Sequence, residues 1–133
     1  MLGVVDAAQA IGDLTEISPQ VRHVAVIGAD GAVVGSNLAD EAAAGRLADG
    51  ARQLVEAAEE LRSGVAQLEA ATTAGSVFVV RDGDRLIAAT TTPEPTVGLV
   101  FYDLKTCLRS VDEPKPKAAR RTPAKKQADD AAA

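Results

Sequence analysis

The residues that could carry chemistry in this chain are few and isolated. The sequence contains one histidine, His23, and one cysteine, Cys107. A general base or a nucleophile needs a partner group that orients or activates it, and no such partner is identifiable by spacing. We therefore interpret His23 as a surface or strand-edge residue and Cys107 as a small buried apolar residue. One cysteine and one histidine also exclude a disulfide framework and a conventional zinc site.

The lysine and aspartate patterns add no further reactive site. The first lysine is Lys105, so the chain lacks the Gly-Lys-Ser/Thr segment with which a P-loop holds phosphates. Asp30, Asp82 and Asp84 flank glycines, which is typical of tight turns and does not give the alternating oxygen ligands of a calcium loop. We predict no catalytic residue, no metal and no cofactor. The chain is expected to bind other molecules and not to be an enzyme.

Charge and composition divide the 133 residues into two parts. Residues 112–133 carry six basic and four acidic residues with three prolines, and alanine is their only apolar type. This composition predicts a disordered Lys/Ala/Pro-rich tail. Residues 1–111 keep eight basic and fifteen acidic residues, a net charge of −7, and are long enough for one domain.

Composition also limits the partners and the compartment. With one tyrosine, two phenylalanines and no tryptophan, the chain lacks the stacking rings of single-strand binders, so a nucleic-acid partner is not expected. No apolar run reaches the roughly 18 residues of a membrane span, so we expect no membrane insertion. No secretory signal is visible, and the default expectation is a cytoplasmic protein.

Apolar periodicity predicts eight elements within residues 1–111. The expected helices are 3–16, 40–62 and 96–110, and the expected strands are 21–28, 32–36, 65–72, 76–81 and 85–91. Asp30-Gly31 and Asp82-Gly83 predict two-residue hairpin turns with positive φ at both residues. The order α-β-β-α-β-β-β-α predicts an α+β domain with a five-stranded antiparallel sheet and a long central helix.

The long helix and the strand after it have features of an interface. One apolar stripe is predicted along the helix, formed by Leu47, Ala51, Leu54, Ala58 and Leu61. Gly45 and Gly50 each lower helix stability by about 1 kcal/mol, and we infer that packing compensates, some of it from another chain. The strand at 65–72 has mixed polarity, which suits an edge strand or one at an interface.

These patterns together resemble the Roadblock/dynein light chain family, over roughly residues 8–111. The resemblance is carried by the apolar strand and turn at 24–31, the leucines of the long helix, the 77–87 hairpin and the Val97-Gly98-Leu99 opening of the last helix. Its implied fold has a profilin-like layout. Members form homodimers, or heterodimers with a paralogous subunit, in which the sheets join through the third strand and the long helices pack side by side.

The resemblance also implies a function and a set of site residues. The implied dimer interface consists of Leu47, Ala51, Leu54, Ala58, Val65 and Leu68. The implied partner surface contains Arg52, Glu56 and Glu59. Bacterial members commonly regulate a small Ras-like GTPase, so the expected function is that of a dimeric, non-enzymatic regulator of such a GTPase. The alternative is a dimeric scaffold that docks a larger signalling or motor assembly.

Overall fold

The computed structural model describes residues 6–111, so the predicted tail at 112–133 lies outside the described residues. The predicted order of elements is confirmed, and most boundaries agree within one or two residues. The elements are α1 (Ala7–Ile17), β1 (Val21–Ile27), β2 (Val33–Ser36), α2 (Glu41–Leu61), β3 (Gln67–Thr72), β4 (Gly75–Asp82), β5 (Arg85–Thr91) and α3 (Val97–Ser110). Among these residues, no helix is long and apolar enough to cross a membrane.

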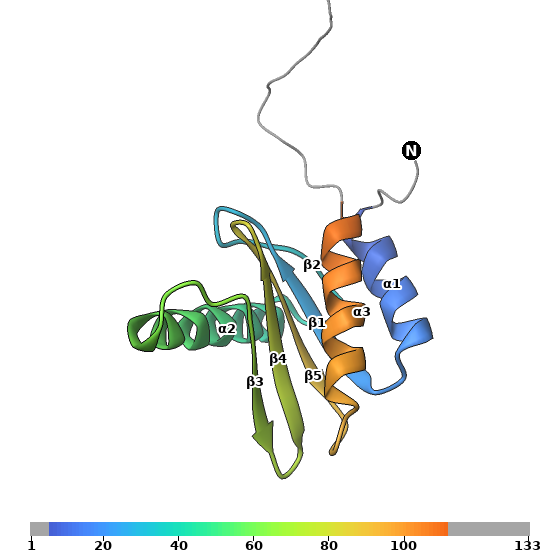
Figure 1. The fold of residues 1–133 in the computed structure, drawn as a ribbon. Coiled ribbons are helices and arrows are strands. Elements are labelled where there is room, and N and C mark those ends of the chain that lie inside the picture. The colour runs from blue at the N-terminus through green and yellow to red at the C-terminus, as the bar shows by residue number, and fades with distance from the viewer. Residues whose placement is uncertain (1–5, 112–133) are drawn as a thin grey trace, which may run out of the picture.

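The five strands form one antiparallel sheet in the order β2-β1-β5-β4-β3. Helix α2 lies across one face, and α1 and α3 lie side by side on the other (Figure 1). Strands β2 and β3 are therefore the two edges. Strand β2 has only four residues, and its pairing with β1 is interrupted by a register shift. Strand β3 pairs regularly with β4 along its whole length.

The sheet separates two apolar clusters. The larger one fills the space under α1 and α3, where Phe78 is fully buried and meets Phe101 edge to face with ring centroids 4.9 Å apart. The smaller one lies under α2, where Ala48, Ala51 and Val55 cover β-strand residues such as Val79. Central strand β4 is thus covered on both faces over most of its length, as its continuous apolar run predicts.

Helix α2 begins where the carboxylate of Asp40 accepts the Ala42 and Ala43 amides at 2.8 and 3.4 Å, so Asp40 caps the helix. The predicted apolar stripe is correct for Ala51 but wrong in where it places the centre of the buried face. The residues that face the sheet are Ala44, Ala48, Ala51 and Val55. Small side chains let the helix lie close to the sheet, so the larger leucines are displaced to its flank, and Leu61 is 87% exposed.

Both predicted two-residue turns are also wrong in detail. Asp82 pairs with Arg85, so the two-residue loop is Gly83-Asp84, with positive φ at Gly83 only, the arrangement of a type II′ turn. The first hairpin is longer because residues 28–32 separate its strands. There the Asp30 carboxylate accepts the Ala32 amide at 3.0 Å, and Gly31 alone has positive φ.

Candidate functional site

The open edge of β3 is the first part of the candidate site. The Arg81 amide donates to the Ala66 carbonyl at 2.9 Å, and the register pairs Leu68 with Val79 and Ala70 with Val77. Hydrogen-bonded pairs alternate along an antiparallel ladder, so Leu68, Ala70 and Thr72 bond to β4. The backbone groups of the residues between them, Gln67, Glu69 and Ala71, therefore point toward the open edge.

An apolar groove beside this edge is the second part. Helix α2 packs mainly on β1, β2 and β5, which leaves the α2 face of β3 and β4 incompletely covered. Leu47 and Leu54 of α2 and Val77 of β4 line a groove of about 410 Å³. Gly50 and Ala51 complete its apolar lining, and Arg46 and Gln53 stand at it as polar residues.

The predicted interface residues differ in how close they lie to this groove and in how deeply they are buried. Leu47, Leu54 and Leu68 are half-buried against the cluster under α2. Ala51 is buried beneath the helix at 1% exposure, and Ala58 is half-buried one to two turns further along. Val65 precedes β3, in the connection from α2. Ala70 and Val77, also half-buried on this face, were missed, although the alternation of β3 and its neighbour in the hairpin would have indicated them.

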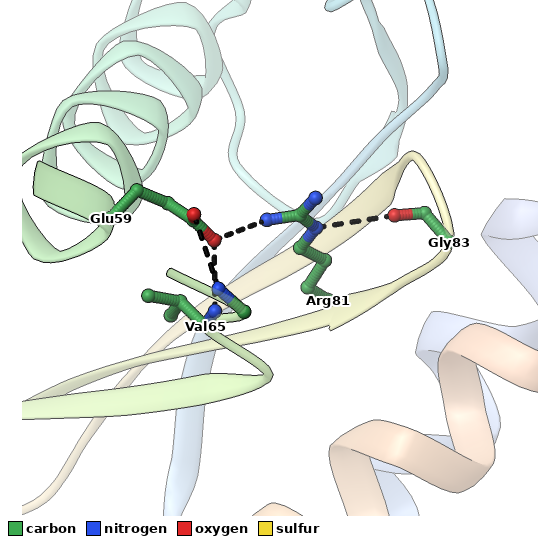
Figure 2. A network of polar contacts seen from close by, with 5 residues as sticks. Glu59, Val65, Arg81 and Gly83 are labelled. Atoms are coloured by element: carbon green, nitrogen blue, oxygen red, sulfur yellow. Dashed lines mark hydrogen bonds and ion pairs between the residues drawn. The ribbon is translucent and has the colours of Figure 1, made fainter. Parts of the chain in front are cut away.

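Glu59 has a structural role at the start of β3. Its carboxylate accepts the Val65 amide at 2.8 Å and the Gly64 amide at 3.2 Å, and it pairs with Arg81 at 2.9 Å (Figure 2). Arg81 also donates to the Gly83 carbonyl at 3.2 Å. The Val65 and Gly64 amides, and then the Arg81 guanidinium, lower the pKa of the Glu59 carboxyl. This network joins the end of α2 to the β4–β5 turn and fixes where the edge strand begins.

The other two predicted partner-surface residues differ from each other. Arg52 donates to the Gly31 carbonyl at 2.7 Å and forms an ion pair with Asp49, so it ties α2 to the β1–β2 loop. Glu56 is exposed on the outer side of α2. The structure thus brings Arg52 and Glu59 into contacts within the chain and leaves the Glu56 carboxylate facing solvent.

The two residues with reactive side chains lie apart from this surface. His23 is exposed on β1, with its Nδ1 atom 3.4 Å from the Thr90 hydroxyl. Cys107 is buried in α3, and burial, with a smaller effect of the Asp13 carboxylate, raises the pKa of its thiol to about 11. Such a thiol is protonated at neutral pH and a poor nucleophile. Within residues 6–111, no cluster of three or more His, Cys, Asp or Glu residues could hold a metal ion.

Comparison with known proteins connects this architecture to solved structures. No protein-family model and no curated protein matches the sequence. A Roadblock/LC7 domain from Streptomyces avermitilis is similar with a TM-score of 0.70 and 18% identity, covering 80% of this chain and 94% of that one. Another Roadblock/LC7 domain from the same organism has a TM-score of 0.60 and 25% identity, covering 77% and 95%. MglB from Myxococcus xanthus has a TM-score of 0.62 and 14% identity, covering 78% and 89%. The predicted Roadblock resemblance is confirmed at the level of the fold.

Proposed function

We propose that two copies of this chain join along β3 and α2, and that the dimer is a non-enzymatic binding protein that regulates a small Ras-like GTPase. One observation carries the proposal: the unpaired edge of β3 and the uncovered apolar groove adjoin each other. The Roadblock fold and the family resemblance supply the class of partner.

The physical case for the dimer rests on what a lone chain would leave exposed. An unpaired regular strand invites pairing with another chain, and proteins usually shorten or distort such edges. Strand β2 is short and irregular, whereas β3 has six regularly paired residues. Joining two copies of β3 would satisfy outward backbone groups such as those of Glu69 and Ala71. It would also cover Leu47 and Leu54, because the second α2 would lie over the same continuous sheet.

The proposed regulation rests on surface recognition. In such a dimer, the outer sides of both α2 helices share one face and present Glu56 twice. A regulator acts by binding one nucleotide state of the GTPase more tightly than the other. An arginine contributed to the GTPase active site would stabilise transition-state charge. Arg52 would serve that purpose only after release from Gly31 and Asp49, so we place it in the positioning of α2.

Two measurements test the proposed function. Sedimentation equilibrium over a wide concentration range should give twice the mass of the chain. Titration with purified Ras-like GTPases from the same genome, loaded with GDP or a non-hydrolysable GTP analogue, should show one with a clear preference for one nucleotide state. Negligible binding of every such GTPase in both states would refute regulation. Equal, measurable binding of both states would favour the scaffold function instead.

A further inference from the structure

We infer that the two chains pair through antiparallel β3 strands with Ala70 directly opposite Ala70 of the partner. This inference rests on the proposed dimer and specifies its register. The register decides which side chains meet across the interface, and therefore which second chain fits. It follows from the backbone pattern of β3, the charge of Glu69 and the contact that ends the edge at Val65.

Symmetry leaves only a few possible registers. In a two-fold dimer the same patch serves both subunits, so β3 strands that join edge to edge run antiparallel. In an antiparallel pair, the backbone N–H and C=O groups of two directly opposite residues either both point toward the other strand or both point away from it. Each allowed register therefore places one residue opposite its own copy. Within β3 the central candidates are Leu68, Glu69, Ala70 and Ala71.

Charge excludes the register centred on Glu69. That register would put two carboxylates opposite each other, with their Cα atoms about 5.5 Å apart, and like charges placed this way destabilise a sheet. The Glu69 carboxylate already accepts a hydrogen bond from the Ser76 hydroxyl at 2.7 Å. The side chain is thereby held over the sheet, on the side of α1 and α3.

Two further registers are excluded because too few residues of the two β3 strands would pair. Centring on Ala71 would pair only residues 70–72 of the strand with each other. Centring on Leu68 would pair only residues 67–69 unless the edge extended through Val65. The Val65 amide is unavailable for that extension because it donates to the Glu59 carboxylate at 2.8 Å. The Glu59 network thus limits how far the pairing can extend past the first residue of β3, at the end of the strand that follows α2.

The register centred on Ala70 satisfies every constraint. It pairs residues 68–72 of both strands, and Glu69 and Ala71 of opposite chains exchange backbone hydrogen bonds. Each Glu69 carboxylate then lies opposite the methyl group of Ala71 instead of another carboxylate. On the α2 face the small Ala70 side chains meet at the axis, next to Val77, where both grooves converge. A large residue there would hold the two α2 helices apart.

Disulfide formation between single cysteine variants shows directly which residue lies opposite its own copy. Separate variants place cysteine at Leu68, Glu69, Ala70 and Ala71, and each full-length protein is oxidised mildly and run on a non-reducing gel. Opposed residues of a non-hydrogen-bonded pair have Cα atoms about 4.5 Å apart, within the range of about 4.4–6.8 Å that a disulfide spans. Ala70→Cys should form a disulfide-linked dimer efficiently. Wild type, whose Cys107 is buried, should not.

A matched charge pair gives an independent test. Ala70→Lys places two ammonium groups at the axis and should weaken dimerisation at least about tenfold. Ala71→Lys places each ammonium opposite the Glu69 carboxylate of the partner and should leave dimerisation intact or tighten it. Circular dichroism establishes that both variants are folded.

The outcomes separate the register from the dimer itself. Efficient cross-linking at Leu68, Glu69 or Ala71 but not at Ala70, in a protein that sediments as a dimer, would overturn the register and leave the proposed function standing. A wild-type chain that stays monomeric at high concentration, with no cross-link at any position, would overturn both. A dimer in which Ala70→Lys and Ala71→Lys behave alike would also contradict the assigned register.

Discussion

Replacing Gly50 with alanine should stabilise the single chain and weaken the proposed dimer. Gly50 lies inside α2, and a Cβ atom added there meets no heavy atom within 4 Å in the single chain. Glycine in a helix interior costs about 0.8–1.0 kcal/mol relative to alanine. The substitution should therefore raise the free energy of unfolding of a single chain by about 1 kcal/mol, which corresponds to roughly 4 °C or more in Tm for a domain of this size.

The opposite effect on association follows from the position of Gly50 at the groove. In the proposed dimer the second α2 approaches this groove, so the added methyl group enters a close helix contact. Overpacking of this kind costs typically about 1–3 kcal/mol, and symmetry makes the contact occur twice. Because about 1.4 kcal/mol corresponds to a factor of ten in Kd, the dimer should dissociate at least about tenfold more readily.

Gly12→Ala provides the control. Gly12 lies in α1 on the opposite face of the sheet, and a Cβ atom there also meets nothing within 4 Å. It should stabilise the chain similarly without changing Kd. Sedimentation equilibrium measures Kd, and urea unfolding in the Ala70→Lys background measures the stability of the single chain. If Gly50→Ala and Gly12→Ala have the same effect on Kd, α2 does not approach its partner at this groove.

Three further predictions concern the fold and its titration. Gly75→Ala should prevent folding, because its Cβ would lie 2.0 Å from the Thr91 carbonyl oxygen, whereas Gly83→Ala, with open space and positive φ, should cost only about 1–2 kcal/mol in urea unfolding. The pKa of the Glu59 carboxyl is lowered in the folded chain from its ordinary value of 4.5. The ionised carboxylate therefore stabilises the fold above that value, and this contribution is lost as pH falls through the folded pKa. Glu59→Gln should flatten the acid limb of a curve of unfolding free energy against pH. The pKa of Cys107 rises from 9.0 to about 11, so the contribution of this thiol to folded stability should be constant below pH 9 and be lost toward pH 11. Cys107→Ala should remove that part of the alkaline fall in chemical unfolding followed by circular dichroism.

Element order was predictable because the strands and helices of this chain have distinct periodicities. The apolar run of β4 and the alternation of β3 each agree with a strand covered on two faces or on one. The cap at Asp40 was equally local, since a carboxylate before a helix accepts its first free amides. Such features depend on residues close in sequence, and tertiary packing reinforced them.

Turn details and side-chain networks were not predictable in the same way. The Asp82-Gly83 pair favours a turn, but the pairing of β4 with β5 decides which two residues form it. That pairing places Asp82 in the strand and Asp84 in the turn. The contact between Glu59 and Arg81 joins residues that are 22 positions apart. Its existence depends on how α2 ends relative to β4, which no spacing in the sequence specifies.

The displaced stripe of α2 is the arrangement expected if its apolar residues serve the proposed assembly as well as folding. A helix that had to stabilise this domain alone would direct its leucines at the sheet, because a leucine removes more apolar surface from water than an alanine. Here the sheet receives Ala44, Ala48 and Ala51, while Leu47 and Leu54 remain half-exposed at the groove. Apolar surface therefore stays exposed in a single chain on the side of α2 that adjoins the open edge of β3. This arrangement stabilises the molecule only when another surface covers the groove, and an extended sheet that carries a second α2 would cover it.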